Sequence, residues 1–401
     1  MQGNFQKEVP TSALYVHVPF CKSRCAYCDF YSCRLSELGS VSHAASMPQA
    51  SDGEGLMRQY VDALLFEMER VAASKGTVRL RSLYFGGGTP SLLPPYAWDA
   101  VMERIHSRFT LVPDAEITVE MNPDDVDSHL ARHLKALGVN RASLGVQSFH
   151  DETLHLLGRR HDARQAVKAV ETLHAEGITN LSVDLIYGLP SQTPEAFRED
   201  VRTALSLPVS HLSAYALSIE DGTPMERMVA RGAWHPADED TSLRMYTDLM
   251  EDMESAGWVH YEISNFARPG FHSRHNSSYW AGTPYIGLGP AAASYDGRRR
   301  RRLNLPDLHA YISAARLGID VPHEEEHLSD DALHNELIMT RLRTCGGLPL
   351  NLLAKHDRDE VLLLAEPHLQ RGNLQMSDGH LRLTRRALFV ADDVISDFMR
   401  C

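Results

Sequence analysis

Six short runs of β-branched and aromatic residues, each followed by a helical pattern, constrain the fold of this chain most strongly. The runs lie at 14–20, 81–87, 116–122, 141–147, 181–188 and 211–219. The helical patterns between them lie at 54–75, 95–108, 124–137, 162–177 and 194–206. Strands that alternate with helices are typical of βαβ units around a parallel sheet. Six such units predict an α/β fold, an open three-quarter (βα)6 barrel rather than a closed eight-stranded one.

The rest of the chain suggests an insertion and two further domains beside a barrel domain of residues 1–224. Residues 34–55 are rich in Ser, Ala and Gly and predict a surface loop. Residues 225–327 lack the βα alternation and form an extension. From 328 to 401, helical patterns surround "NLQMSDGHLRLTRRAL", where Asp-Gly between strand-like runs indicates a hairpin. Two helices, a hairpin and a helix predict a small winged-helix-like C-terminal domain.

Five consecutive arginines at 298–302 would, in isolation, suggest a nucleic-acid-binding patch. The whole chain, however, carries a formal net charge of −13 and has a pI of about 5.9. An acidic surface repels phosphate backbones. We therefore expect the arginines to form a solvated hairpin edge, and we expect no nucleic-acid partner.

Four of the six cysteines lie together in "CKSRCAYCDFYSC", directly after the first predicted strand. The sequence shows neither an apolar stretch of membrane-spanning length nor a hydrophobic signal core at its start. We therefore expect a cytoplasmic location. In that reducing compartment clustered cysteines more often bind metal or perform chemistry than form disulfides. Cys345 and Cys401 are isolated, and we expect a core thiol and a terminal thiol.

The spacing C-x3-C-x2-C of Cys21, Cys25 and Cys28 favours an iron–sulfur cluster. Three thiolates on one loop can hold three corners of a cubane and leave one iron open to another ligand. Zinc is the main alternative, but structural zinc sites use four ligands, usually in two closely spaced pairs. Here the fourth ligand would be Cys33 or a remote histidine, and the sequence has no second cysteine pair.

Polar residues and glycines stand where the predicted strands end. "FGGGTPS" follows the second strand, Glu120 and Gln147 end the third and fourth strands, and Asp184 lies on the fifth. In a parallel barrel the carboxyl ends of the strands surround the active-site mouth. Glycines allow a ligand to approach the backbone, whose amides and carbonyls can bind a charged amino-acid moiety. These residues together predict a binding site at one rim of the barrel.

Several motifs carry a family resemblance. They are "YVHVPFCKSRCAYCDF", "GGGTPSLL", "VEMNPDD", "SLGVQSF", "VDLIYGLPSQT" and "HNSSYW". Together they resemble the radical S-adenosylmethionine (SAM) enzymes, and within these the branch of oxygen-independent coproporphyrinogen III oxidases (HemN) and haem chaperones (HemW). The resemblance runs from about residue 13 to 400, with 34–55 as an insertion.

The resemblance implies a [4Fe–4S] cluster on Cys21, Cys25 and Cys28, with SAM bound at the open iron. The positions that match SAM-binding residues of the family are Tyr15, Tyr27, Gly87, Gly88, Thr89, Glu120, Gln147, Arg159 and Asp184. In such enzymes an electron passed to the sulfonium breaks a carbon–sulfur bond and yields a deoxyadenosyl radical. The cofactors carry that chemistry, and the protein positions them.

Two features separate the members of this branch. The oxidases extend the motif to C-x3-C-x2-C-x-C, whereas Phe30 stands at the last position here. "HNSSYW" matches the HNxxYW signature of the haem-binding members, which makes His275 a candidate axial haem ligand. The alternative is a hydrogen-bonded histidine in a packed turn beside Tyr279 and Trp280. We expect this segment to lie beside the barrel mouth, because it follows the last barrel strand.

The resemblance therefore predicts a haem chaperone that binds haem and passes it to acceptor proteins. An electron donor and a transient contact with a membrane protein are further expected partners. One alternative is an enzyme, an oxygen-independent coproporphyrinogen III dehydrogenase that decarboxylates its substrate oxidatively. A second alternative is a structural zinc protein without redox chemistry.

Overall fold

A computed structural model describes residues 11–36 and 53–400 of the chain. Our expectations for the start of the sequence, for most of the 34–55 insertion and for the Cys401 thiol concern residues outside this description.

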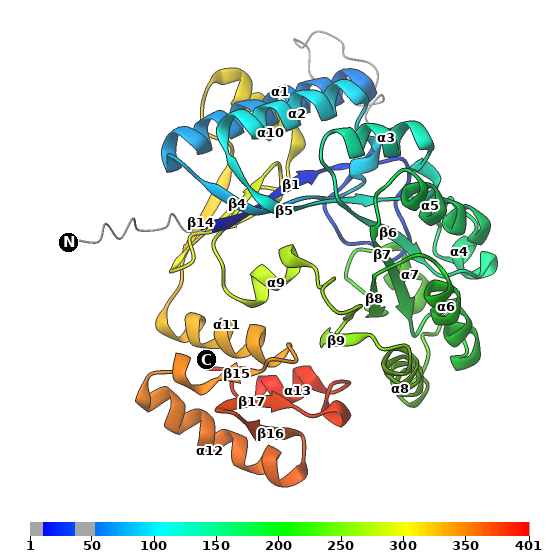
Figure 1. Cartoon of the computed structure of the whole chain (residues 1–401), viewed down its shortest axis with the longest axis vertical. Helices are drawn as coiled ribbons and strands as arrows, with labels where there is room; N and C mark the ends of the chain where they lie inside the picture. The colour runs from blue at the N-terminus through cyan, green and yellow to red at the C-terminus, as the bar shows by residue number, and fades with distance from the viewer. Residues whose placement is uncertain (1–10, 37–52, 401) are drawn as a thin grey trace.

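One twelve-stranded sheet curves through the molecule, in the order β14-β13-β12-β11-β1-β4-β5-β6-β7-β8-β10-β9 (Figure 1). Its six central strands are parallel and correspond to the predicted barrel strands. They are β1 (Thr11–Val18), β4 (Arg79–Gly87), β5 (Thr110–Met121), β6 (Arg141–Gln147), β7 (Asn180–Tyr187) and β8 (His211–Ala216). The open (βα)6 barrel is therefore confirmed.

Helices cover the outer face of the six parallel strands. They are α1 (Gly53–Lys75), α2 (Pro95–Arg108), α3 (Ser128–Ala136), α4 (Asp151–Leu156), α5 (Ala163–Ala175) and α6 (Pro194–Ser206). Capping residues explain where two of these helices begin. Thr193 caps α6 by accepting a hydrogen bond from the Ala196 amide, and Asp162 and Gln165 form a capping box at α5. The six-residue helix α4 was not predicted, since it is too short to show a helical period.

The segment after the barrel extends the sheet at both ends, which the sequence did not predict. At one end β10 (Asn265–Ala267) pairs antiparallel with β8, and β9 (Val259–Glu262) pairs with β10. At the other end β11 (Tyr285–Leu288) pairs parallel with β1. The remaining elements are α7 (Pro224–Ala230), α8 (Glu239–Ser255), α9 (Arg274–Trp280), β12 (Ala293–Tyr295), β13 (Arg300–Asn304), α10 (Leu308–Leu317) and β14 (His323–His327).

The arginine run forms the predicted hairpin, but it does not form the edge of the sheet. Strand β13 pairs on one side with β12 and on the other with β14, which is the outer strand. Acidic side chains neutralise the arginines: Arg300 pairs with Glu325 at 3.0 Å, and Arg302 pairs with Asp320 at 3.1 Å. Arg300 and Arg302 therefore form ion pairs with carboxylates of the same chain.

The C-terminal part has the predicted order of two helices, a hairpin and a helix, around a separate apolar core that includes Ile338, Leu381 and Phe398. Its elements are α11 (Asp330–Leu342), β15 (Leu348–Pro349), α12 (Lys355–Arg371), β16 (Leu374–Ser377), β17 (His380–Leu383) and α13 (Ala391–Ser396). Asp378 and Gly379 turn the hairpin with φ angles of 52° and 74°, as a type I′ turn requires. The domain boundaries at 224 and 327 stay a prediction.

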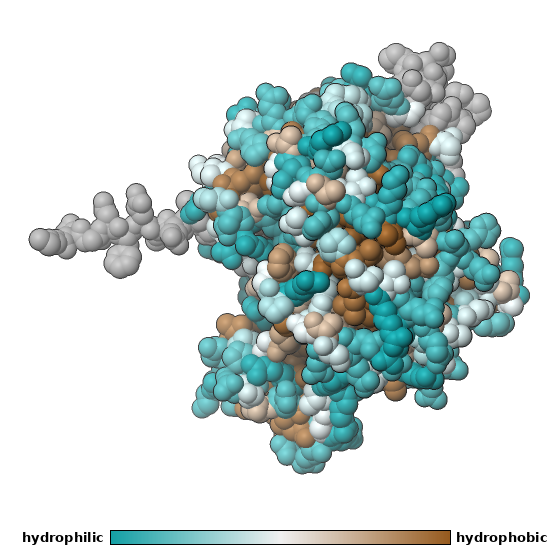
Figure 2. All heavy atoms as spheres, turned by 45° about the vertical axis from the view of Figure 1, so that its right-hand side comes forward, coloured by the Kyte–Doolittle hydropathy of each residue, from teal (hydrophilic) through white to brown (hydrophobic). Residues whose placement is uncertain are grey.

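Among the described residues, no helix is long and apolar enough to cross a membrane. Figure 2 shows one face of the molecule as largely hydrophilic, with apolar residues gathered near its centre.

Candidate functional site

The cysteine loop begins where β1 ends. Its two ends are held together by a short parallel pair, β2 (Phe20–Cys21) and β3 (Cys33–Arg34), in which Phe20 faces Cys33. Cys25 and Cys28 lie in the loop between these strands, and both are half-buried. Cys33 stands in the strand that pairs with the strand of Cys21, and its sulfur lies 3.7 Å from the Tyr31 hydroxyl. Cys21 and Cys33 therefore lie at the two ends of the loop that carries Cys25 and Cys28.

Residues of the neighbouring strands contact two of these thiols. The Cys21 sulfur lies 3.4 Å from Thr89 Oγ1, and Arg159 Nη1 donates to the Cys25 sulfur at 3.3 Å. Burial raises the pKa of the Cys28 thiol to about 11 and also raises that of Cys21. A bound metal would therefore have to displace protons from these thiols.

In the part of the chain that the structure describes, no three His, Cys, Asp or Glu side chains meet at a point where one metal ion could bind. The half-buried thiols of Cys21, Cys25 and Cys28 lie on one loop. In a cubane each cysteine binds a different iron, so three thiols on one loop fit such a cluster.

The glycines after β4 bring that strand against the cysteine loop. The Gly88 amide donates to the Val18 carbonyl at 2.8 Å, and a Cβ on Gly88 would lie 2.7 Å from the Phe20 carbonyl oxygen. Gly87 has a φ of 105°, and a Cβ there would lie 2.6 Å from the His17 ring. We predicted that these glycines admit a ligand. The structure shows that close contact with the first strand and its loop already requires glycine.

Two carboxyl groups lie inside the barrel below this rim. Tyr84 donates its hydroxyl to Glu120 Oε1 at 2.7 Å, and the Gly87 amide donates to Glu120 Oε2 at 3.2 Å. Burial, together with the nearby charge of Asp184, raises the pKa of Glu120 to about 7. Ser143 donates to Asp184 at 3.3 Å, and burial also raises the pKa of Asp184. The two carboxyls are therefore held in place in a poorly solvated environment.

Arg159 links the cysteine loop to two barrel strands. Besides Cys25, it donates to Asn122 Oδ1 at 2.7 Å and to the Gly145 carbonyl. Gln147 ends β6 in the left-handed region, with a φ of 72°. A non-glycine residue adopts this conformation only at some cost and where its surroundings hold it there. The surrounding structure at this rim must therefore stabilise the left-handed backbone conformation of Gln147.

The two predicted tyrosines lie on different sides of the rim. Tyr15 stacks on Tyr84 inside the barrel, with ring centroids 6.1 Å apart, and its hydroxyl lies 3.1 Å from His17 Nδ1. Tyr27 packs against a small apolar cluster that contains Leu157. Of the predicted residues, Thr89 contacts Cys21, and both Arg159 and Tyr27 contact Cys25.

Further polar residues of the barrel interior were missed by the sequence analysis. They occupy alternate positions of the parallel strands, and the side chains of several contact one another across the interior. The set comprises Ser82, Tyr84, Glu116, Thr118, Arg141, Ser143, Ser182, His211 and Ser213. The sequence signal that could have found them is the repeat of polar residues at every second position, because residues two apart in a strand lie on the same face of the sheet.

Helix α9 carries the HNSSYW motif into the barrel interior from the end at which the strands begin (Figure 1). The His275 amide donates to Glu116 at 3.0 Å, and Glu116 pairs with Ser82 of β4, well before the end of that strand at Gly87. Our expectation that this motif lies beside the mouth is therefore wrong. The chain returns beneath the barrel before β11 joins β1, so the motif approaches from the side opposite the cysteine loop.

His275 is 1% exposed, and both of its ring nitrogens have partners. Nδ1 lies 3.0 Å from Ser82 Oγ, and Nε2 lies 3.0 Å from the Tyr279 hydroxyl. The ring stacks on Tyr84 at 4.7 Å, and burial lowers its pKa to about 3. This geometry is the hydrogen-bonded alternative that the sequence left open. An axial bond to haem iron would require the Nε2 contact to break.

Comparisons with known proteins match both the barrel and the C-terminal part of the chain. Residues 15–204 match the Radical SAM superfamily, and residues 328–390 match the HemN C-terminal domain. The haem chaperone HemW of Mycobacterium tuberculosis is 36% identical to the chain over 95% of this chain and 93% of its own length. That of Synechocystis is 38% identical over 89% of this chain and 84% of its own length.

A solved structure supports the fold. Coproporphyrinogen III oxidase (HemN) from Escherichia coli, a radical SAM enzyme, has a TM-score of 0.81 and is 22% identical, covering 97% of this chain and 90% of its own.

Proposed function

The chain belongs to the radical SAM superfamily and, within it, to the HemW family, and on this premise we propose that it is a haem chaperone. It binds haem and transfers it to acceptor proteins. The observation that carries the proposal is the extent of the similarity: proteins named haem chaperone HemW match nearly the whole chain, beyond the barrel alone. An electron donor and a transient contact with a membrane protein complete the proposed partners, and the proposed location is the cytoplasm.

We further propose that Cys21, Cys25 and Cys28 hold a [4Fe–4S] cluster and that SAM binds at its open iron. When bound, the cluster and SAM supply one-electron chemistry at the sulfonium of SAM. The chain's own residues orient them: Arg159 and Thr89 contact the cysteine sulfurs, and the strand ends approach the loop closely. The residues proposed to bind SAM are Tyr15, Tyr27, Gly87, Gly88, Thr89, Glu120, Gln147, Arg159 and Asp184.

The SAM site is testable by substitution at the strand ends. Replacing Glu120, Gln147 or Asp184 singly by Ala should weaken SAM binding about tenfold or more, because a hydrogen bond to a charged group contributes ~1.5–3 kcal/mol. Calorimetric titration of the reconstituted protein measures this, and iron content should stay near that of the wild type. Glu171→Ala, at an exposed position on α5, is the control. Unchanged affinity in all three variants would contradict the rim site.

Haem binding is tested by titrating the reconstituted protein with ferric haem while assaying coproporphyrinogen turnover. We expect stoichiometric binding and no protoporphyrinogen. Phe30, which is 63% exposed, stands where the oxidases carry a further cysteine and supplies no thiolate. Formation of protoporphyrinogen in the presence of SAM and a reductant would support the enzymatic alternative instead.

The axial role of His275 stays a proposal, and it has its own test. His275→Ala should shift or abolish the haem Soret band and spare the cluster. Tyr279→Phe is the matched variant, since it removes the hydroxyl that now contacts Nε2 and should leave the imidazole free to bind iron. A Soret band that is indifferent to His275→Ala would place the haem ligand elsewhere.

A further inference from the structure

Strand β6 does not end as a regular strand. Its pairing with β7 shifts near the end, where Gly145 faces Asp184 and Gln147 already faces Leu185. In this stretch β6 advances by two residues and β7 by one, which is a β-bulge. A bulge bends its strand and changes the direction of a side chain. Together with the φ of 72° at Gln147, it means that an unusual backbone directs this side chain.

The bulge brings the Gln147 side chain beside Arg159. A Cβ built on Gly145 would lie 3.0 Å from Gln147 Nε2 and 3.5 Å from Arg159 Nη2, so both side chains lie over this glycine. Arg159 also donates to the Cys25 sulfur at 3.3 Å. Gln147 is therefore the neighbour of a residue that contacts the cysteine loop, at the rim where we propose that SAM binds.

Two side chains hold the backbone that precedes Gln147. The Gly145 carbonyl accepts a hydrogen bond from Arg159, and the Val146 carbonyl oxygen lies 3.1 Å from His161 Nε2. Burial and the nearby charge of Arg159 lower the pKa of His161 to about 4. His161 is therefore neutral at pH 7 and donates from Nε2, since a carbonyl oxygen only accepts.

Asp200 holds the backbone that follows Gln147. It lies on α6, on the outer side of the barrel, and is 0% exposed (Figure 1). The Ser148 hydroxyl donates to Asp200 Oδ2 at 2.9 Å, and the Phe149 amide donates to Oδ1 at 2.5 Å. The Ser148 oxygen in turn accepts from the His150 amide at 3.1 Å. One carboxyl group of α6 thus fixes the turn after β6.

This carboxyl group differs from the other acidic groups of α6. Glu195 and Glu199 are exposed, whereas Asp200 is buried. Burial raises the pKa of Asp200 to about 6, so it is mostly a carboxylate at neutral pH and accepts from both donors. Its burial is costly unless these donors satisfy it, which makes the position of the turn specific.

We propose that Asp200 is a positioning residue of the SAM site and that it acts through Gln147. By fixing Ser148 and Phe149, the carboxylate holds the left-handed backbone that presents the Gln147 side chain at the rim. The inference rests on the proposed SAM site, and it adds to that site a residue on the outer helix layer.

Calorimetric titration of the reconstituted protein with SAM tests the inference in a double-mutant cycle. Asp200→Ala should weaken SAM binding about fivefold, with iron content near that of the wild type. In the Gln147→Ala background the same substitution should change the affinity by less than about twofold, because the side chain through which Asp200 acts is already absent. Asp200→Asn retains one oxygen that accepts a hydrogen bond, so its affinity should lie between those of Asp200→Ala and the wild type.

Val201→Ala is the matched control. Val201 is the next residue of α6, is 1% exposed and has no polar group that could hold the turn. Its truncation leaves a cavity in the core and should lower the melting temperature, but SAM affinity should stay at the wild-type value.

Hydrogen exchange of the protein without SAM gives a second measurement. The Phe149 amide donates to Asp200, so the segment 147–150 should exchange faster in Asp200→Ala than in Val201→Ala. Ser148→Ala is the milder variant if Asp200→Ala does not fold, since the Phe149 amide still satisfies the carboxylate. Its smaller loss of SAM affinity should likewise disappear when Gln147 is replaced by Ala.

The possible outcomes separate the inference from the proposed function. Unchanged SAM affinity in Asp200→Ala and Ser148→Ala, with weakened binding in Gln147→Ala, overturns the inference and leaves the SAM site intact. A fivefold loss that persists in the Gln147→Ala background also overturns it, since Asp200 would then act by another route. Absence of SAM binding in the wild type overturns the proposed SAM site itself.

Discussion

Cys25→Ser is expected to leave the anaerobically reconstituted protein without iron, whereas the wild type should hold about four irons per chain. Cys25 lies in the middle of the loop, and its sulfur accepts a hydrogen bond from Arg159 at 3.3 Å. Removing its thiolate takes away one of the three cysteine ligands of the proposed cubane, which has no fourth cysteine ligand. Cys21→Ser and Cys28→Ser should have the same effect. Iron content and visible absorbance measure the result.

Cys33→Ser is the matched control for this series. Cys33 pairs with Phe20 in the short sheet that closes the loop, and it lies outside the C-x3-C-x2-C spacing of the three proposed ligands. Its serine variant should keep the iron even if its melting temperature falls. Loss of iron from Cys33→Ser as complete as that from Cys25→Ser would show that the three-ligand assignment is wrong.

The barrel was predictable from sequence because each of its elements carries a local signal. The strand 141–147 and the helices 95–108 and 194–206 agree with the prediction residue for residue. Long apolar strands buried on a helix-covered face, together with capped helices, reveal themselves within their own residues. The Asp378-Gly379 turn was also predictable from its own residues, because the two positive φ angles of a type I′ turn favour Asp followed by Gly.

The strands added at the two ends of the sheet were not predictable in the same way. Strands β10 and β12 have three residues each, and β11 pairs with β1, which precedes it by more than 260 residues. A three-residue strand has no measurable period, and its partner is fixed by tertiary packing. The location of α9 inside the barrel is a consequence of the same long-range pairing. The prediction for the HNSSYW segment failed for that reason.

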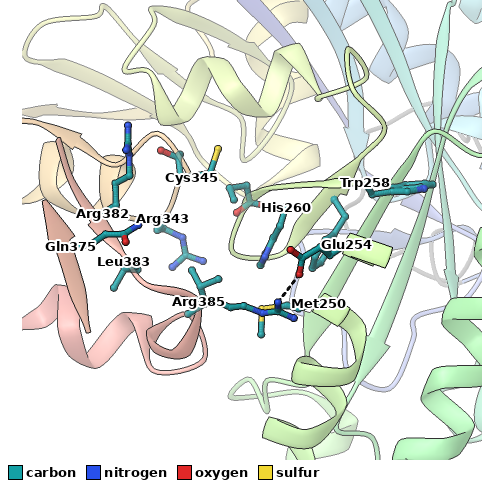
Figure 3. Close-up of a pocket in the computed structure, with 14 residues that line it drawn as sticks. Met250, Glu254, Trp258, His260, Arg343, Cys345, Gln375, Arg382, Leu383 and Arg385 are labelled. Atoms are coloured by element: carbon teal, nitrogen blue, oxygen red, sulfur yellow. Dashed lines mark hydrogen bonds and ion pairs between the residues drawn. The ribbon is translucent and has the colours of Figure 1, made fainter. Parts of the chain in front are cut away.

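The candidate site was predictable in part. Strand position alone indicated that Glu120 lies near the end of β5. Asp184 instead lies in the middle of β7, and its carboxyl is buried inside the barrel. Tyr84, which joins Glu120 to the His275 ring, was not predicted, because it lies within β4 and not at the carboxyl end of the strand. Cys345 was expected to be a core thiol, but it is exposed and lines a cleft between β9 and the C-terminal part (Figure 3). That placement could not be found from sequence, since the walls of the cleft come from segments that are far apart along the chain.

Gly88→Ala is expected to disrupt the site, although Gly88 is not a cluster ligand. A Cβ at this position would lie 2.7 Å from the Phe20 carbonyl oxygen and 2.9 Å from that of Val18. Both are backbone atoms of the segment that leads into the cysteine loop, so no side chain can rotate away. Overpacking of this kind costs about 1–3 kcal/mol or more. The loop must move away from β4, which separates Cys21 from Thr89.

The expected result for Gly88→Ala is a lower melting temperature together with a severalfold loss of SAM affinity and incomplete iron loading. Gly76→Ala is the matched control. Gly76 follows α1 with a φ of 68°, and nothing lies within 4 Å of a Cβ built there. That variant should lose only about 1 kcal/mol through backbone strain and keep its iron and SAM binding. Equal melting temperatures and equal binding of iron and SAM in the two variants would contradict this prediction. They would show that Gly88 is not required for the close contact between β4 and the cysteine loop.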